Sequence, residues 1–266
     1  MSEAGYTFHA GQTPLLISIP HDGRVLPVDI ELRMTAAGKA LPDTDWHVAQ
    51  LYRFATDIGA SVITAGLSRY VIDLNRPAAD SPLYAGQVST GLCPAKTFAG
   101  ESIYLNDATV DEDERNVRVA RYWRPYHDRI GETLALLKDA HGYALLWDAH
   151  SIISEVPALF DGELPVLNLG TYQGRSCDQG IEDALAEVAR QSPYSAVCNG
   201  RFTGGFITRH YGAPDEHVHA VQLELAQRSY MDEKTLRYDA SRSAALIETL
   251  RELLLTFMRS AQSLYG

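Results

Sequence analysis

Histidines and carboxylates stand after several short apolar runs of this sequence, and both residue types can bind metal ions and transfer protons. His21 follows the run Leu15–Ile19, and His150 comes two residues after Asp148, which ends a second run. Asp45 lies in the segment PDTDW, near the start of an expected helix. Two histidines and one carboxylate are a catalytic zinc set, with water as the fourth ligand. Their wide separation in the sequence matches no compact metal motif, so spacing alone does not establish the site.

Each of these residues also has an ordinary structural interpretation. His21 can close a turn after a strand, and Asp45 can lie in the acidic first turn of a helix, where carboxylates are favoured. Asp43 fits the N-cap of that helix at least as well. Asp148 can orient the imidazole of His150, as carboxylates behind metal-bound histidines do. Metal binding therefore stays a hypothesis on these residues alone.

Glu224 lies among apolar residues in AVQLELAQ, at the end of an expected strand. A buried carboxylate is costly unless it is paired. One interpretation is that Glu224 turns to the solvent face of the strand together with Gln222. The other is a general base whose pKa is raised by burial and which lies close to a metal-bound water.

Several arginines stand near strand ends or glycines. Asn75 and Arg76 follow an apolar run in VIDLNRP. A guanidinium binds a carboxylate in a bidentate fork, and a neighbouring amide can add a donor. Surface ion pairing is the other interpretation of each arginine, whereas several in one crevice of an acidic protein would indicate an anionic small substrate. The remaining members of this group are Arg69, Arg201, Arg209 and His210.

Two common catalytic signatures are absent from the sequence. The segment Gly200–Gly205 lacks the GxxxxGK[ST] pattern and a strand–loop–helix context, which excludes a phosphate-binding loop. No GxSxG motif supports a serine hydrolase. Ser151 beside His150 does not replace that motif, because adjacent residues of an extended chain point to opposite faces.

The composition is that of an acidic globular protein of 266 residues with a formal net charge of −11. Nucleic acids and anionic membranes are bound by clustered lysine and arginine, so this charge argues against both as partners. The cysteines Cys93, Cys177 and Cys198 have no zinc-ribbon spacing and indicate a reducing compartment. Because no secretory signal and no transmembrane run are found, we expect a cytoplasmic protein. The oligomeric state is left open.

Short apolar runs alternate with longer helical patterns, which is typical of an α/β fold, here one domain over residues 1–266. We expect strands at Leu15–Ile19, Ser61–Ala65, Tyr70–Asp73, Ala144–Asp148, Val166–Leu169, Ala196–Cys198 and Ala220–Leu225. We expect helices at about 43–58, 111–138, 178–190 and 232–261, with Pro125 kinking or splitting the second. The segment 77–110 is rich in turn-forming residues and is expected to be either a lid or a packed excursion.

Four of the expected strands end in, or carry, charged or metal-capable side chains. In open α/β sheets, ligands bind just beyond the carboxyl ends of the strands. We therefore expect the polar residues after these strands to share one crevice.

Six segments carry a resemblance to a known family. They are SIPHDGRVLP, LPDTDWHVAQLY, SRYVIDLNRP, LLWDAHSI, NGRFTGGFITRHYG and AVQLELAQRSYMDE. In this order, from about residue 14 to 233, they closely resemble the N-formylglutamate amidohydrolases, which belong with zinc carboxypeptidase-like and aspartoacylase-like enzymes. The resemblance implies a mixed, mostly parallel sheet flanked by helices, of the zinc carboxypeptidase-like (phosphorylase/hydrolase-like) class.

The resemblance also implies roles for single residues. The implied metal ligands are His21, Asp45 and His150. Carboxypeptidases take two ligands from an HxxE pattern, but here Arg24 stands three residues after His21. The carboxylate must come from elsewhere, and Asp45 is preferred to Asp43 and Asp22.

The remaining implied roles concern the base and the substrate. Glu224 matches the general-base glutamate on a late strand of such enzymes. Asn75–Arg76 is similar to the pair that holds the substrate carboxylate in the aspartoacylase relatives. The other implied substrate-binding residues are Arg69, Arg201, Arg209 and His210.

The activity implied by the resemblance is hydrolysis of N-formyl-L-glutamate to formate and L-glutamate, the last step of a histidine degradation route. The implied cofactor is one divalent metal ion, zinc before cobalt or another transition metal. Two alternatives remain: a deacylase for another N-acyl acidic amino acid (acetylaspartate or succinylglutamate type), and a non-catalytic binder of anionic amino acids. Carboxylate binding alone needs neither the metal set nor Glu224, which argues against the binder.

Overall fold

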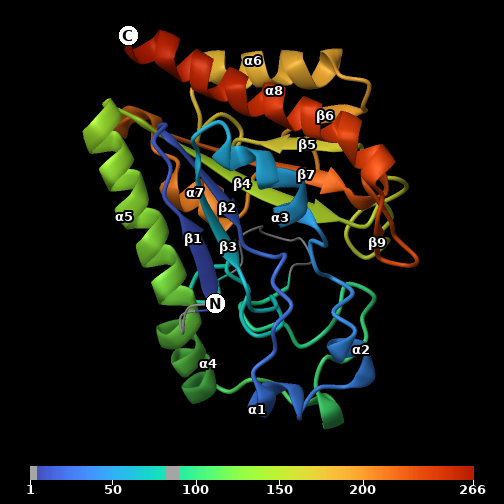
Figure 1. The fold of residues 1–266 in the computed structure, drawn as a ribbon. Coiled ribbons are helices and arrows are strands. Elements are labelled where there is room, and N and C mark those ends of the chain that lie inside the picture. Colours follow the sequence, from blue (N-terminus) through green and yellow to red (C-terminus); the bar gives the residue numbers. More distant parts are fainter. Residues whose placement is uncertain (1–4, 82–89) are drawn as a thin grey trace.

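A seven-stranded mixed sheet runs through the centre of the computed structural model, which describes residues 5–81 and 90–266 (Figure 1). The strand order is β1–β3–β2–β4–β7–β5–β6, and four of the six neighbouring pairs are parallel. The strands are β1 Tyr6–His9, β2 Leu15–Ile19, β3 Ser61–Ala65, β4 Ala144–Ile152, β5 Leu167–Gly170, β6 Ala196–Cys198 and β7 Val218–Ala226. A second, two-stranded sheet joins β8 Met231–Asp232 to β9 Arg237–Tyr238. The expected α/β domain with a mostly parallel sheet is confirmed.

Helices cover both faces of the sheet (Figure 1). They are α1 Val28–Glu31, α2 Ala36–Lys39, α3 Val48–Leu51, α4 Glu112–Arg118, α5 Arg124–His141, α6 Gln179–Gln191, α7 Phe206–Tyr211 and α8 Ala240–Tyr265. Short 3-10 segments are η1 Tyr52–Thr56, η2 Leu105–Asp107, η4 Pro214–Glu216 and η5 Gln227–Ser229, and η3 Val119–Trp123 is a π-helical turn. Buried residues of α3, α6 and α8 share one core, whereas those of α5 and α7 belong to the core on the other face.

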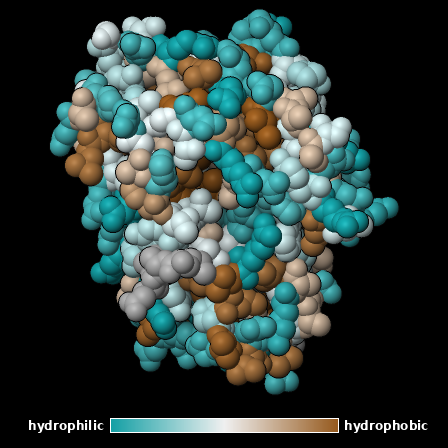
Figure 2. Space-filling model, in the orientation of Figure 1, coloured by the Kyte–Doolittle hydropathy of each residue, from teal (hydrophilic) through white to brown (hydrophobic). Residues whose placement is uncertain are grey.

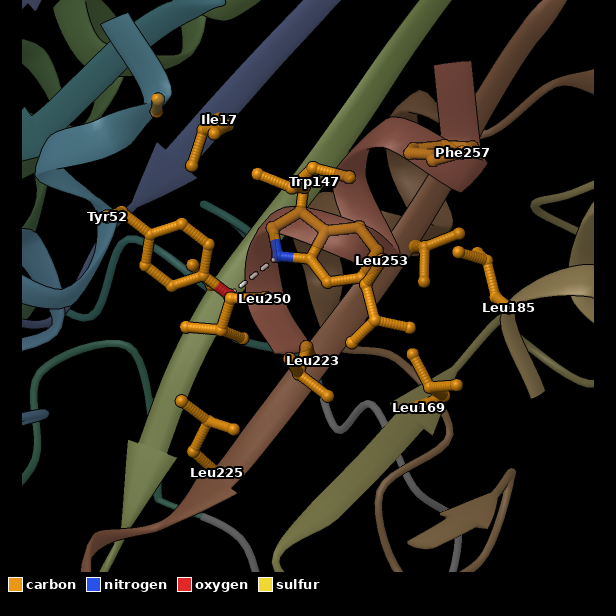
Figure 3. Close-up of a cluster of buried hydrophobic side chains, with 14 of the residues drawn as sticks. Ile17, Tyr52, Trp147, Leu169, Leu185, Leu223, Leu225, Leu250, Leu253 and Phe257 are labelled. Atoms are coloured by element: carbon orange, nitrogen blue, oxygen red, sulfur yellow. Dashed lines mark hydrogen bonds between the residues drawn. The ribbon is translucent and has the colours of Figure 1, made fainter. Parts of the chain in front are cut away.

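Neighbouring residues of the central strands enter different cores, because strand side chains alternate between the two faces of a sheet. In β4, Leu145 and Trp147 pack with α6 and α8, whereas Leu146 packs with α5. Trp147 is fully buried among leucines and donates its indole N–H to the Tyr52 hydroxyl at 2.8 Å (Figure 3). All nine residues of β4 are buried, as expected for a central strand covered on both faces.

Strand β2 lies between β3 and β4 in the sheet. The chain passes from β2 to β3 on one side of β2, and then from β3 to β4 on the other side of β2. The first crossover includes α3, and the second includes α4 and α5. Open α/β sheets bind ligands at such a switch point, beyond the carboxyl ends of the strands. His21 and His150 lie at this point.

Most expected strands are confirmed, three of them with unchanged bounds. The expected strand Tyr70–Asp73 is wrong, because these residues form a buried loop. Tyr70, Val71 and Ile72 fill the core beside α5. A short apolar run fits a buried loop as well as it fits a strand, so periodicity does not separate the two.

The expected helices differ mainly at their starts. Residues 43–47 are irregular, and helix begins only at Val48. The helix expected at 111–138 is divided just before Pro125 by the π-helical turn η3, as the proline indicated. The last helix begins at Ala240, because β8 and β9 occupy residues 231–238. The short elements β1, α1, α2 and α7 were not expected.

Residues 82–89 of the segment 77–110 lie outside the described residues, so the choice between a lid and a packed excursion stays a prediction for the segment as a whole. Leu92 and Ile103, in the described remainder, are buried in the core. Exposed apolar side chains include Val28 and Leu32, and Figure 2 shows brown surface at the lower end of the molecule, where Figure 1 places α1. No helix of the described residues is long and apolar enough to cross a membrane.

Candidate active site

The carboxyl ends of β2, β4 and β7 bring the expected metal ligands and the expected base together. His21 lies two residues beyond β2, and His150 lies near the end of β4. Glu224 of β7 pairs in register with His150, so both side chains share one face of the sheet. Asp45 comes from the irregular segment before α3, and its N–H donates to the His21 carbonyl at 3.1 Å.

Within residues 5–81 and 90–266, His21, Asp45 and His150 are the group of side chains that could hold a metal ion. One ligand atom of each lies within 4.8 Å of the others, and all three residues are buried. Asp45 Oδ2 lies 3.0 Å from His150 Nδ1 and 3.7 Å from His21 Nδ1. Two imidazole nitrogens and one carboxylate oxygen are the donors of a catalytic zinc site. The residues present therefore fit a divalent transition metal.

The far nitrogen of each histidine is held by an aspartate. His21 Nε2 lies 2.7 Å from Asp73 Oδ1, and His150 Nε2 lies 3.0 Å from Asp148 Oδ2. Such carboxylates fix the ring orientation and the tautomer of metal-bound histidines. A proton on His21 Nε2, where Asp73 accepts it, leaves the Nδ1 lone pair of that ring facing Asp45, and His150 also turns its Nδ1 toward Asp45. This role was expected for Asp148; for Asp73 it was missed, although the residue stands out in VIDLNRP.

Buried negative charge is concentrated around these histidines. Four carboxyl groups are buried there: Asp45, Asp73, Asp148 and Glu224. Burial alone would raise the pKa of Asp45, but His21 and His150 outweigh it and hold that pKa below its usual range. Burial opposes charge on His150, yet Asp148 and Asp45 hold its pKa well above the usual value. These carboxylates favour a positive charge at their centre, as a divalent cation would supply.

Arg69 is the buried cation beside these carboxylates. Its guanidinium lies 2.7 Å from Asp73 Oδ2 and 3.7 Å from Asp45 Oδ1. The side chain also lies over the Phe98 ring at 5.1 Å. Burial opposes its charge, but Asp73, Asp45 and Asp43 hold the pKa of Arg69 above the usual value. A permanent positive charge therefore borders the metal-capable group.

Glu224 has a pKa suited to proton transfer. Its side chain is 7% exposed, and burial raises its pKa to about 8. A carboxyl group with a pKa near neutral pH both accepts and returns protons efficiently. Gln222 is also buried, at 3% exposure. The solvent-face interpretation of Glu224 and Gln222 is therefore wrong.

The two other aspartates that could have supplied the carboxylate ligand have different partners. Asp22 accepts hydrogen bonds from the N–H groups of His47 at 3.2 Å and Ala49 at 2.9 Å, so it caps the start of α3. Asp43 accepts from the Tyr70 hydroxyl at 2.6 Å and the Phe98 N–H at 2.8 Å. The structure thus groups Asp45, rather than Asp43 or Asp22, with the histidines.

A cavity opens over these groups. All the site residues expected from the sequence line it except Arg209 and His210. Further residues of the wall are Thr90, Phe98, Ser151, Ile152, Leu159, Phe202, Gly205 and Gln222. The cavity therefore combines metal-capable and basic side chains with an apolar wall, and nothing in the residue types had singled out that wall.

Arg76 and Arg201 line the cavity from different segments of the chain. Arg76 Nε donates to the Thr90 carbonyl at 2.8 Å, and Arg201 Nε donates to the Leu159 carbonyl at 2.6 Å. The backbone of Arg76 is held as well, because the Trp123 indole N–H donates to its carbonyl at 2.9 Å. Both guanidinium groups are therefore anchored at the cavity.

Arg209 and His210 lie in α7, away from the cavity wall. Arg209 donates to the Gly204 carbonyl at 2.8 Å and to Thr203 Oγ1 at 3.1 Å, so it supports the loop that precedes α7. The exposed His210 ring stacks on Phe206, with ring centroids 4.9 Å apart. The structure does not bring these two side chains to the other expected residues.

Asn75 connects α7 to the site. Its Oδ1 accepts from the Ile207 N–H at 2.8 Å, and its Nδ2 donates to Asp148 Oδ2 at 3.2 Å. The same Nδ2 lies 2.9 Å from His150 Nε2. Asn75 therefore positions the groups behind His150 as well as lining the cavity.

Comparison with known proteins identifies the family. The family model described as N-formylglutamate amidohydrolase matches residues 13–231, which is most of the chain. This chain belongs to the N-formylglutamate amidohydrolase family. The resemblance carried by the six sequence segments is therefore confirmed.

Relatives in the N-formylglutamate amidohydrolase family match nearly the whole chain. A protein of Pseudomonas putida named N-formylglutamate deformylase is 50% identical over 252 residues, which cover 93% of each chain. A protein of the same name from Pseudomonas aeruginosa is 49% identical over 262 residues and 98% of each chain. The crystal structure of N-formylglutamate amidohydrolase from Ralstonia eutropha JMP134 has a TM-score of 0.81 at 24% identity, over 98% of each chain, which shows the same fold.

Proposed function

We propose that this protein hydrolyses the amide bond of N-formyl-L-glutamate to formate and L-glutamate. Two relatives with half of its residues in common, over nearly the whole chain, are named N-formylglutamate deformylases. The observation that carries the proposal is the position of Glu224, in register with the metal-capable His150 and inside a cavity lined by arginines. A base beside a metal site suits amide hydrolysis, and fixed guanidinium groups suit a dicarboxylate.

His21, Asp45 and His150 are proposed to hold one divalent ion, with zinc preferred and cobalt or another transition metal as alternatives. The support is the closeness of their donor atoms and the buried negative charge around them. When bound, such an ion lowers the pKa of a water molecule and polarises a carbonyl oxygen.

Glu224 is the proposed general base. Its carboxylate removes a proton from water as the water oxygen bonds to the formyl carbon. The same group returns that proton to the glutamate nitrogen as the C–N bond breaks, which releases formate and the free amine. A pKa of about 8 suits a group that takes up and returns one proton. Arg69 borders this centre and supplies positive charge for the developing oxyanion.

Arg76 and Arg201 are proposed to bind the two carboxylates of the substrate. Both line the cavity, and each is anchored through Nε to a backbone carbonyl. Asn75 lies next to Arg76 and contributes to the same wall. Arg209 and His210 do not line the cavity and are left out of the proposed contacts. The family resemblance also supports a place at the last step of a histidine degradation route.

The test is formate release from N-formyl-L-glutamate by the purified protein. The assay is run as prepared, after chelation and after zinc add-back, with N-acetyl-L-aspartate in parallel. We expect rapid formate release that disappears with the chelator and returns with zinc. Turnover that persists in fully metal-free protein would remove the metal from the proposal. No turnover with any added metal would discard the deformylase function itself.

A further inference from the structure

Gln222 is a buried polar residue of β7, two positions before the proposed base. It lines the cavity and points to the same face of the strand as Glu224. In register it pairs with Asp148 of β4, as Glu224 pairs with His150. The side chain therefore belongs to the reaction centre by position.

Two hydrogen bonds determine the orientation of the Gln222 carboxamide. Its Oε1 accepts from the Gly205 N–H at 2.6 Å, and its Nε2 donates to Glu224 Oε2 at 3.3 Å. A backbone N–H only donates, so the end of the amide that faces Gly205 must be the oxygen. The end that faces Glu224 is then the NH₂ group, which also only donates. The carboxyl oxygen that it meets must therefore act as an acceptor.

The anchor of this amide is itself held in place. Gly205 directly precedes α7, and a Cβ on it would lie 2.3 Å from Asn75 Nδ2. Asn75 in turn accepts from the Ile207 N–H at 2.8 Å. The carboxamides of Asn75 and Gln222 thus both bind the backbone at the start of α7. Gln222 is held there through its oxygen, so its NH₂ group has a fixed position beside Glu224.

We propose that Gln222 is a positioning residue for Glu224: its NH₂ group holds Oε2 as an acceptor and leaves Oε1 to take the proton from water and return it. Among the described residues, this amide is the hydrogen-bond partner found for the Glu224 side chain. The inference rests on the proposed function of Glu224 as the base.

The Gln222→Glu variant separates the two hydrogen bonds. A glutamate of the same shape still accepts from the Gly205 N–H, but in place of the neutral NH₂ donor it puts a second carboxyl group beside Glu224, which repels the Glu224 carboxylate or competes with it for one proton. We expect kcat for N-formyl-L-glutamate to fall about 10-fold or more, with KM within about 2-fold, because the base rather than the substrate is affected. Retained kcat would mean that Gln222 only holds α7, and would overturn the inference.

The Gln222→Leu variant is combined with Glu224→Gln to test whether Gln222 acts through the base. Alone, Gln222→Leu is expected to lower kcat about 10-fold. In the Glu224→Gln background it should change the residual kcat less than about 2-fold, because no base remains to be positioned. Equal losses in both backgrounds would indicate general damage to the site and overturn the inference.

His219→Gln is the matched control, because His219 is also a buried, hydrogen-bonded residue of β7. Its partners are the Tyr265 hydroxyl at 2.6 Å and the Asp178 N–H at 3.1 Å, away from the cavity wall. We expect unchanged kcat in this control. Thermal unfolding shows whether each variant is folded. If Gln222→Leu does not fold, the test rests on Gln222→Glu, which keeps the hydrogen bond to Gly205. Wild-type turnover in Glu224→Gln would instead remove Glu224 as the base and overturn this inference, whereas the proposed hydrolysis would stand.

Discussion

Toward its carboxyl end, beyond Leu146, strand β4 has two faces that are equally buried but opposite in chemistry. Leu145 and Trp147 enter the apolar core with α6 and α8, and the one polar atom of the Trp147 side chain is satisfied by Tyr52. Asp148 and His150 point to the other face, where they too are almost fully buried, at 0% and 3% exposure. Burial alone therefore does not separate a core from a reaction site. A reaction site differs from an apolar core in that its buried groups carry charge and are paired with groups of opposite charge or with hydrogen-bond partners.

The two faces of this strand therefore have different roles, one in stability and the other in the reaction site. Apolar burial on one face stabilises the backbone position, and the same backbone carries His150 on the other face. The charged face opposes folding unless its groups are paired, because carboxylates and imidazolium are costly to remove from water. Substitutions on the apolar face should thus change stability, and substitutions on the polar face should change chemistry.

Trp147→Ala should show the largest effect and should act on stability. Removing a fully buried tryptophan leaves a cavity, and we expect the free energy of unfolding to fall by about 3–5 kcal/mol. Urea denaturation measures this loss, and the activity per folded molecule should be retained. The control is Leu136→Ala at an exposed position, expected to stay within about 0.5 kcal/mol of the wild type. A loss as small as that of the control would break the comparison.

Glu224→Gln should show the opposite pattern. We expect kcat to fall by about 100-fold or more, since general-base catalysis contributes that much, while metal content is unchanged. The Tm should not fall, because a buried carboxyl group is replaced by a neutral amide of equal size. Steady-state kinetics and elemental analysis on the same sample test both points. Turnover near the wild-type rate would remove Glu224 from the mechanism.

Asp73→Asn sharpens the role of the carboxylates behind the histidines. Loss of the partner of His21 Nε2 should weaken metal affinity by about 10–100-fold, the range for such residues. The matched control is Asp43→Asn, a nearby buried aspartate that bonds Tyr70 and Phe98 instead. Competition with a chelator measures both affinities. Equal losses in the two variants would show that buried charge in general, rather than the contact with His21, supports the metal.

Arg76→Ala should have the smallest effect of the four and should appear mainly in KM. Loss of a charged hydrogen-bond partner of a substrate carboxylate corresponds to a KM increase of about 10-fold. The comparison is made with N-formyl-L-glutamate over a wide concentration range, with thermal unfolding as the check on folding. An unchanged KM would show that Arg76 has only a structural role.

Much of the site was accessible from the sequence, because strand ends in an α/β sheet converge on one edge. His21, His150 and Glu224 each follow or end an apolar run, and the structure brings them together there. The choice of Asp45 over Asp43 and Asp22 was implied only by family resemblance. It depends on the irregular turn before α3, whose course no periodicity describes.

Other features depended on packing that residue types do not reveal. Asp73 lies in a buried loop where a strand was expected, so its contact with His21 was not foreseen. The role of Gln222 depends on α7, a helix of six residues that is too short to show an apolar period. Arg209 and His210 belong to that same helix, and neither side chain lines the cavity.

The hydrogen bond from Trp123 to the Arg76 carbonyl has a practical consequence. The chain contains three tryptophans, and Trp147 lies in the apolar core far from solvent. Trp123 instead touches the backbone of a proposed substrate-binding arginine and stacks on His127 with ring centroids 3.8 Å apart. We expect the intensity or wavelength of Trp123 fluorescence to change when a dicarboxylate binds to the Arg76 guanidinium. This fluorescence change would report ligand binding without an added label, and we expect it to be lost in Trp123→Phe.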